Sequence, residues 1–209
     1  MHVTPQDVLI VVDIQNDFCP GGALEVPDGD AVIQPIRRMA KLFSHIILTQ
    51  DWHPPDHSSF AANHIGRKPY QSIRMEYGEQ TLWPTHCVQG THGAEFHPAL
   101  NLPQAELIVR KGYRKAIDSY SAFFENDRTT ATGLSSYLRE RGLNRVLVAG
   151  LAYDYCVAYT ALDARRLGIS VYVVRDACRS INVGDSVARI ESAFEKTGVV
   201  VIDSGEISA

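Results

Sequence analysis

Three features are missing from this sequence of 209 residues, and each absence excludes a class of protein. No apolar stretch approaches the roughly 20 residues that a transmembrane helix needs, so we expect no association with a membrane. No basic stripe accompanies the net charge of −4, so nucleic acid is not an expected partner either. No C-x-x-C pair occurs, and the four cysteines are spread along the chain, which is typical of reduced thiols rather than of a disulfide framework: Cys19, Cys87, Cys156 and Cys178.

The composition is that of an ordinary globular protein. Apolar residues make up 45% of the chain and charged residues 21%, so disorder is not indicated. The length predicts a single domain over residues 1–209. The first residues lack the cationic segment and the small-residue cleavage site of a signal peptide, and together with the reduced thiols this predicts a cytoplasmic protein.

Apolar runs alternate with amphipathic segments along most of the chain. The runs predict strands at 7–13, 45–50, 106–111, 145–150, 169–175 and 198–202, and the segments between them predict helices at 30–43, 131–141, 154–167 and 185–197. This alternation predicts an α/β fold of three layers, doubly wound around a mostly parallel sheet of about six strands. The stretch 54–105 breaks the rhythm, and we interpret it as an active-site insertion, since ordered loops of this length are usually functional.

Four of the predicted strands lead into reactive side chains. Asp13 ends the first strand, Asp51 and His53 follow the second, and Lys111 ends the third. Cys156 follows the fourth after a short turn. Because an open α/β sheet binds its ligand along the carboxyl ends of its strands, we expect these groups to meet in one crevice.

Three of these groups suit nucleophilic catalysis. Cys156 is predicted to open a helix, where the helix dipole and free N–H groups lower the thiol pKa and can receive an oxyanion. Asp13 can accept the thiol proton, and Lys111 can keep that carboxylate ionised. Taken singly, a structural thiol, a capping carboxylate and a surface lysine are the better interpretations; three strand ends together favour catalysis.

The remaining groups suit a metal ion. Asp51 and His53, two residues apart at a strand end, can face the same side, and His86 in the long loop is a third ligand candidate. One carboxylate and two imidazoles suit Zn²⁺, Fe²⁺ or Mn²⁺ and leave positions open for water or substrate. His57 or Ser58 is a candidate for a further ligand. The residues by themselves therefore indicate a metal-assisted cysteine hydrolase of a small substrate.

The same segments resemble the nicotinamidases of the isochorismatase-like (cysteine amidohydrolase) family. Five blocks match in order and span residues 7 to about 202; they are Asp13-Ile14-Gln15-Asn16-Asp17-Phe18 with Pro20-Gly21-Gly22-Ala23-Leu24, Thr49-Gln50-Asp51-Trp52-His53-Pro54, Trp83-Pro84-Thr85-His86-Cys87-Val88-Gln89, Lys111-Gly112, and Gly150-Leu151-Ala152-Tyr153-Asp154-Tyr155-Cys156-Val157. The resemblance implies hydrolysis of nicotinamide to nicotinate and ammonia through a thioester, as a step of NAD salvage. It also implies one divalent metal ion, with zinc the first choice.

The resemblance assigns roles to particular positions. It implies a catalytic triad of Asp13, Lys111 and Cys156 and a metal site of Asp51, His53 and His86. It also implies an aromatic substrate pocket at Phe18 and Trp83, with Leu24 and Tyr113 nearby. The implied oxyanion hole consists of the backbone N–H groups of Ala152 and Cys156, with a cis peptide before Ala152. Tyr153 stands where the family usually has threonine.

Other functions are compatible with parts of this pattern. Another amidase or carbamoyl hydrolase of the same fold would keep Asp13, Lys111 and Cys156 without needing the metal ligands. A non-catalytic metal-binding scaffold would leave the thiol structural, and a thiol redox protein is disfavoured because no resolving cysteine lies near Cys156 in sequence. The oligomeric state stays open, a homo-oligomer included.

Overall fold

A six-stranded sheet forms the centre of the computed structural model, which describes residues 1–209. Its strands lie in the order β5-β2-β1-β6-β7-β8, and every neighbouring pair is parallel. Their bounds are β1 (Asp7–Val12), β2 (His45–Asp51), β5 (Leu107–Lys111), β6 (Arg145–Leu151), β7 (Ser170–Arg179) and β8 (Val200–Ile202). All six predicted strands are present, and the parallel sheet is confirmed.

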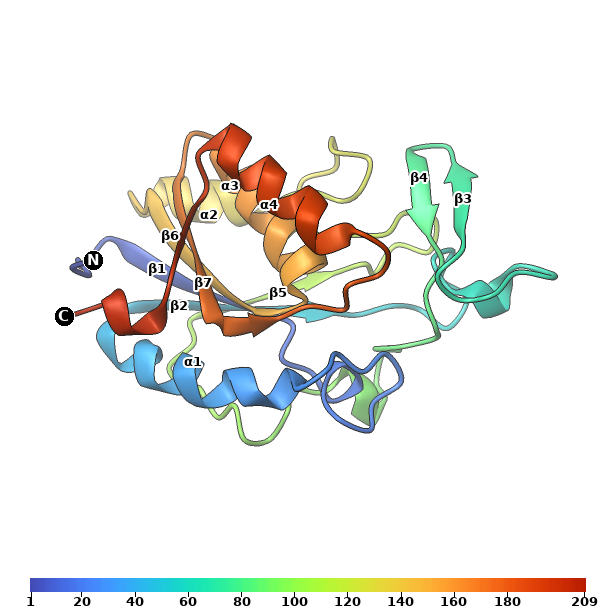
Figure 1. Cartoon of the computed structure of the whole chain (residues 1–209), viewed down its shortest axis with the longest axis horizontal. Helices are drawn as coiled ribbons and strands as arrows, with labels where there is room; N and C mark the ends of the chain where they lie inside the picture. The colour runs from blue at the N-terminus through green and yellow to red at the C-terminus, as the bar shows by residue number, and fades with distance from the viewer.

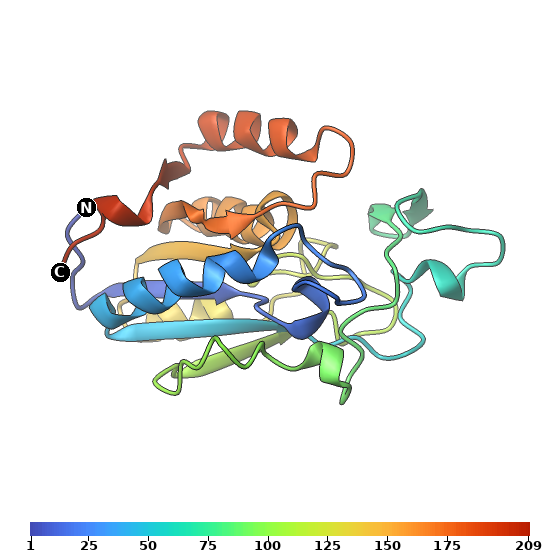
Figure 2. The same cartoon turned by 60° about the horizontal axis from the view of Figure 1, so that its bottom comes forward.

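Helices cover both faces of this sheet. Helix α1 (Ile33–Met39) lies on one face, and α2 (Leu134–Glu140), α3 (Ala158–Arg166) and α4 (Ser186–Thr197) lie on the other, as Figures 1 and 2 show. The central strands are therefore covered on both sides, and every residue of β1 is buried. This burial explains why the strands have near-continuous apolar sequences rather than alternating ones. The predicted three-layer, doubly wound α/β fold is confirmed.

The segment 54–105 contains a hairpin that the sequence did not predict. Strands β3 (Ser72–Met75) and β4 (Gly78–Thr81) pair antiparallel and project beyond the end of the sheet at which the parallel strands terminate (Figure 1). Each strand has only four residues and no fully buried face, so neither has the apolar alternation that would reveal it. The hairpin thus stands beside the edge where the reactive side chains gather.

A close approach between β1 and β6 brings two of the predicted strand ends together. Gly150 has φ +127°, and a Cβ atom built there would lie 2.1 Å from the backbone oxygen of Val12. Only glycine fits this position. The chain after β1 therefore runs directly beside the chain after β6.

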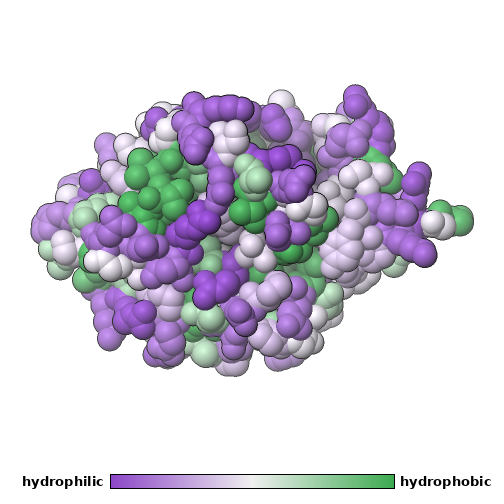
Figure 3. All heavy atoms as spheres, in the orientation of Figure 1, coloured by the Kyte–Doolittle hydropathy of each residue, from purple (hydrophilic) through white to green (hydrophobic).

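None of the helices is both long and apolar enough to cross a bilayer. On the face drawn in Figure 3, hydrophilic residues predominate and the apolar areas are separate from one another.

Candidate active site

Asp13, Lys111 and Cys156 meet at the carboxyl ends of β1, β5 and β6. The Lys111 ammonium nitrogen lies 2.8 Å from Asp13 Oδ2 and 3.3 Å from Cys156 Sγ. All three are buried, with exposed fractions of 0%, 1% and 7%. The structure thus brings together a carboxylate, a cation and a thiol that are far apart in the sequence.

The carboxylate of Asp13 is aimed at this cluster by its backbone and by a neighbour on β2. Asp13 follows the strand with φ +49°, in the left-handed region that aspartate tolerates better than most residues. The Thr49 hydroxyl donates to Asp13 Oδ1 at 2.6 Å. Burial raises the pKa of Asp13, Lys111 lowers it and Asp51 raises it again, with a net rise. Asp13 is therefore a stronger base than an ordinary aspartate.

Lys111 is held in its charged form by two carboxylates. Burial alone would lower its pKa, but Asp13 and Asp51 raise it well above the usual value. The ammonium group forms ion pairs with both carboxylates and donates to the backbone oxygen of Ser119 at 3.1 Å. This side chain therefore supplies a fixed positive charge beside the thiol.

The thiol itself differs from the sequence-based expectation. Cys156 lies in a π-helical turn (Tyr153–Val157) that precedes α3, rather than in the first turn of an α-helix. Burial raises the pKa of the Cys156 thiol well above its usual value, against the lowering effect of Lys111, and Asp13 and Asp51 raise it further. The predicted lowering of this pKa is wrong, because the thiol is enclosed beside two carboxylates. Its nucleophilic form therefore has to be generated by a base.

The three predicted metal ligands also converge. Potential ligand atoms of Asp51, His53 and His86 all lie within 4.8 Å of one another. The Nε2 atoms of the two histidines are 3.5 and 3.6 Å from Asp51 Oδ2. Each Nδ1 atom is 2.8 Å from a backbone carbonyl, that of Gly112 or of Pro84.

This hydrogen-bonding pattern fits a divalent cation. A carbonyl oxygen can only accept, so each Nδ1 carries a proton, and in the neutral form of each ring Nε2 presents a lone pair beside the Asp51 carboxylate. Gly112 is required here, because a Cβ atom at this residue would lie 2.3 Å from the His53 ring. The donor set of one carboxylate and two imidazoles suits zinc, iron or manganese.

The two candidates for a further ligand lie close by with different surroundings. The His57 ring nitrogens are engaged by the Ser59 hydroxyl at 2.7 Å and the Ile117 carbonyl at 3.3 Å. The His57 ring also packs on His53, with centroids 4.3 Å apart. The Ser58 hydroxyl is buried without a hydrogen-bond partner. Neither side chain joins the group formed by Asp51, His53 and His86.

A narrow cavity connects the candidate metal ligands Asp51 and His86 to the Cys156 thiol. Of the residues expected around a substrate, Phe18, Leu24, Trp83, Ala152 and Cys156 line it. Its free volume is about 20 Å³. Four further lining residues were not predicted: Asp118, Tyr120, Tyr155 and Ile181.

Tyr113, the other residue expected near the pocket, does not reach this cavity. Its side chain is 45% exposed, and the Arg114 guanidinium lies 5.0 Å from its ring centroid. Tyr120 occupies the wall instead and is buried. Both tyrosines belong to the irregular segment after β5, where no periodicity indicates which side chain turns inward.

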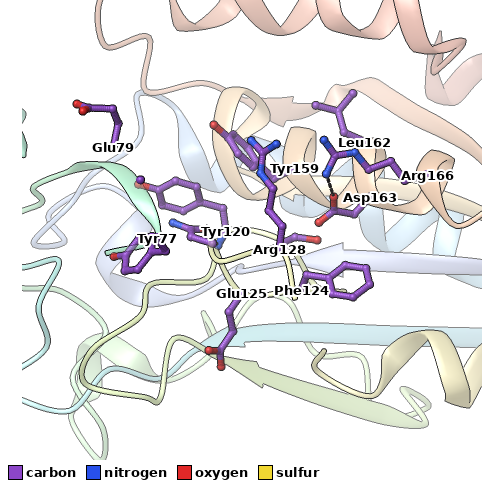
Figure 4. Close-up of a pocket in the computed structure, with 13 residues that line it drawn as sticks. Tyr77, Glu79, Tyr120, Phe124, Glu125, Arg128, Tyr159, Leu162, Asp163 and Arg166 are labelled. Atoms are coloured by element: carbon purple, nitrogen blue, oxygen red, sulfur yellow. Dashed lines mark hydrogen bonds and ion pairs between the residues drawn. The ribbon is translucent and has the colours of Figure 1, made fainter. Parts of the chain in front are cut away.

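Tyr120 also fixes the aromatic wall. Its hydroxyl accepts hydrogen bonds from Trp83 Nε1 at 3.1 Å and from Gln80 Nε2 at 3.0 Å. On its other side Tyr120 borders a second cavity of about 490 Å³, between the β3–β4 hairpin and α3 (Figure 4). Arg128 and Tyr159 both line this cavity, and the carboxylate of Glu125 points away from the other labelled side chains in Figure 4.

Three polar residues hold the surrounding loops, and none was assigned a role from the sequence. Gln15 exchanges hydrogen bonds with the backbone of Asp51 at 2.8 and 2.9 Å, which ties the end of β1 to the end of β2. Asp17 accepts from the backbone N–H of Cys87 at 2.7 Å and so holds the loop that carries His86. Asp154 accepts from the Ser186 hydroxyl and from the backbone N–H groups of Ile181 and Asn182.

The turn before the thiol has the expected backbone. The peptide bond between Leu151 and Ala152 is cis. Tyr153, at the position where threonine is usual in the family that the sequence resembles, does not enter the cavity. Its ring packs edge-on against Phe194 of α4, and its hydroxyl accepts from Arg175 at 3.4 Å. The space beside Cys156 is therefore not occupied by this larger side chain.

Comparison with known proteins matches this geometry to one family. The isochorismatase domain matches residues 7–206. A nicotinamidase of Acinetobacter baylyi is 51% identical over 95% of this chain and 93% of its own length. The solved structure of an Acinetobacter baumanii nicotinamidase and pyrazinamidase has a TM-score of 0.96 and 52% identity, and the match covers 97% of this chain and 98% of that one.

Two further solved structures contain ligands. PnC1 from L. infantum in complex with nicotinate has a TM-score of 0.87 and 37% identity, over 100% of this chain and 98% of that one. A pyrazinamidase of Pyrococcus horikoshii in complex with zinc has a TM-score of 0.77 and 37% identity, over 95% of this chain and 99% of that one.

Proposed function

The chain belongs to the isochorismatase family and is an amide hydrolase, and we propose that it hydrolyses nicotinamide to nicotinate and ammonia, a step of NAD salvage. The observation that carries this proposal is the pairing of two subsites in one cavity. Cys156, which clusters with Asp13 and Lys111, lines this cavity, and so do Asp51 and His86 of the group that includes His53. Nicotinamide has one reacting amide and one ring nitrogen, which match these subsites. The nicotinate-bound relative supports the same substrate class.

The cavity walls orient the substrate. Phe18 and Trp83 line it with apolar ring surface, which suits a flat heteroaromatic molecule. Asp51, His53 and His86 would hold a divalent cation, with zinc the proposed ion, as in the zinc-bound relative. When bound, this cation supplies a Lewis acid that orients and polarises the pyridine ring.

Acylation begins with proton transfer from the thiol to Asp13. The Cys156 sulfur then forms a bond to the carboxamide carbon, and the carbonyl oxygen takes up the negative charge. The backbone N–H groups of Ala152 and Cys156 stabilise that oxyanion, a contribution of about 3 kcal/mol per donor in measured cases. Asp13 returns the proton to the departing nitrogen as the C–N bond breaks, which releases ammonia and leaves a thioester.

Deacylation uses the same residues. Asp13 removes a proton from a water molecule, whose oxygen attacks the thioester carbon. The C–S bond breaks, nicotinate is released, and the proton restores the Cys156 thiol. Throughout the cycle the Lys111 ammonium, 2.8 Å from Asp13 and 3.3 Å from the sulfur, stabilises whichever of the two carries negative charge.

We also propose that residues 1–209 form one catalytic domain that works in the cytoplasm. All three residues of the proposed triad lie at the end of a strand of one sheet or shortly after it, and the family match covers residues 7–206. All four cysteines are free and buried, which suits a reducing compartment.

Substrate comparison tests the function. Nicotinamide, benzamide and an aliphatic amide are compared by ammonia release, with the protein loaded with zinc and after treatment with a chelator. We expect rapid hydrolysis of nicotinamide by the zinc-loaded protein only, and weak hydrolysis of benzamide, which lacks the ring nitrogen. Metal-independent turnover of the aliphatic amide in preference to nicotinamide would instead establish the alternative, a different amidase of the same fold.

A further inference from the structure

Asp118 is a buried carboxylate for which the reaction above has no role. Its side chain is 2% exposed, and it borders the substrate cavity together with Asp51, His86 and Cys156. Its oxygens accept hydrogen bonds from Gln80 Nε2 and from the backbone N–H of Ser119, both at 2.8 Å. These two donors fix its orientation towards the cavity.

Asp118 lies beside the candidate metal ligands Asp51, His53 and His86 but is not one of that group. One of its oxygens lies within 4.8 Å of ring nitrogens of His53 and His57, and yet no lysine, arginine or histidine forms an ion pair with it. A buried carboxylate without a cationic partner is costly. Each oxygen uses one acceptor position on a protein donor, and a carboxylate oxygen has two, so acceptor capacity is left over.

The charge of the whole cavity points in the same direction. Asp13, Asp51 and Asp118 are three carboxylates around a single ammonium, that of Lys111. With neutral imidazoles this leaves two uncompensated negative charges in a closed site. One divalent cation at Asp51, His53 and His86 would balance them. Three protein ligands leave open coordination positions, which water fills and from which water donates hydrogen bonds.

We propose that Asp118 is a positioning residue of the metal subsite, whose carboxylate accepts hydrogen bonds from water bound to the cation. It thereby raises the affinity for the cation and keeps the open coordination position directed into the substrate cavity. This inference rests on the proposed function, because it requires the metal subsite. It assigns Asp118 a role that does not involve proton transfer to or from the substrate.

The test is a metal-binding measurement on the full chain that needs no turnover. Metal-free wild type and Asp118→Asn are titrated with Zn²⁺ against a chromophoric chelator, and the metal-dependent gain in Tm is recorded for both. We expect the Zn²⁺ affinity of the variant to be about 10–100-fold weaker, the range found for partners of metal ligands, with a smaller gain in Tm. Both readouts compare loaded with metal-free protein, so a change in the metal-free fold does not produce them.

Asp127→Asn is the matched control, because it removes the same charge from the same loop. The Asp127 carboxylate caps a turn by accepting from Thr129 and Thr130, away from the substrate cavity. We expect this variant to bind Zn²⁺ like the wild type. If Asp118→Asn does not fold, Asp118→Ser removes the charge with a smaller side chain.

The outcomes separate the inference from the function on which it rests. An Asp118 variant that binds Zn²⁺ within twofold of the wild type overturns the role of Asp118 and leaves the proposed function standing. A wild type that binds no divalent cation overturns the metal subsite, and the inference falls with it.

Discussion

The ammonium nitrogen of Lys111 lies 2.8 Å from Asp13 Oδ2, and neither side chain reaches solvent. Each of these charges has been removed from water, and each depends on the other for stability. The ion pair between Lys111 and Asp13 therefore contributes to the stability of the fold as well as to the proposed catalysis.

Lys111→Met is expected to cost both activity and stability. Without the ammonium group, Asp13 and Asp51 are left as buried carboxylates without a lysine partner, which destabilises a fold by about 3–5 kcal/mol. Hydrolysis of nicotinamide should be lost. Urea unfolding and ammonia release measure the two effects. Lys115→Met is the control, because Lys115 is 67% exposed in its pair with Asp56 and such a surface pair contributes about 0–1 kcal/mol. Equal stability of the two variants would contradict a buried ion pair at Lys111.

The acid limb of the pH profile should report Asp13. Its carboxylate must be ionised to take the thiol proton, and burial raises its pKa above the ordinary value of 3.8. The kcat/KM for nicotinamide should therefore fall as the pH decreases through that raised pKa, because the protonated form is inactive. Asp13→Asn should lose about 10²–10⁴-fold in activity, the usual contribution of a general base. Full activity of the wild type down to about pH 4 would contradict the raised pKa.

Tyr120→Phe should loosen the aromatic wall. The change leaves the buried Trp83 N–H without its acceptor, at a cost of about 1–3 kcal/mol of stability. We expect KM for nicotinamide to rise several-fold and kcat to change less, since the reacting groups are untouched. Tyr113→Phe, at an exposed ring outside the cavity, should leave both constants unchanged. The reverse result, in which Tyr113→Phe raises KM and Tyr120→Phe leaves it unchanged, would contradict the assignment of Tyr120 to the cavity wall.

Asp7 provides a stability test at the opposite end of the sheet. Burial alone would raise its pKa, but the hydrogen bonds from Arg145, whose Nε lies 2.6 Å from Asp7 Oδ1, and from Thr4 lower it overall. A carboxylate with a lowered folded-state pKa stabilises the fold above the unfolded-state value near ~3.9, and this stability is lost as the pH falls through the folded-state pKa. Asp7→Asn should lower the unfolding free energy by about 1.5–3 kcal/mol at neutral pH without changing kcat/KM. The difference from wild type should shrink in acid, and a constant difference would contradict the linkage.

The sheet could be predicted from the sequence because burial on both faces leaves a direct signature. Five of the six predicted strands end within two residues of the observed ones, since apolar runs mark them directly. The exception is β7, which extends to Arg179 instead of ending at 175. Its last residues pair with Gly150 and Leu151 after a shift in register. Such a shift depends on the neighbouring strand and leaves no period in the sequence of β7 itself.

The site could be predicted where a reactive residue follows a strand, and not where an irregular loop positions it. Asp13 and Lys111 are placed by strand register, so their meeting follows from the topology. Asp118 and Tyr120 lie in the segment between β5 and α2, and only the folded chain shows that they reach the cavity. The depth of burial of Cys156 is equally invisible in sequence, which is why the direction of its pKa change was predicted wrongly.

The most direct test of the central claim is the amount of nicotinate and ammonia formed from nicotinamide by zinc-loaded wild type, Cys156→Ala and Cys178→Ala. Cys178 is a second buried thiol, at the end of β7, and it does not line the cavity. We predict equimolar nicotinate and ammonia from the wild type and from Cys178→Ala, and none from Cys156→Ala. A Cys156→Ala protein that still converts nicotinamide at the wild-type rate, or a zinc-loaded wild type that releases no ammonia, would contradict the account.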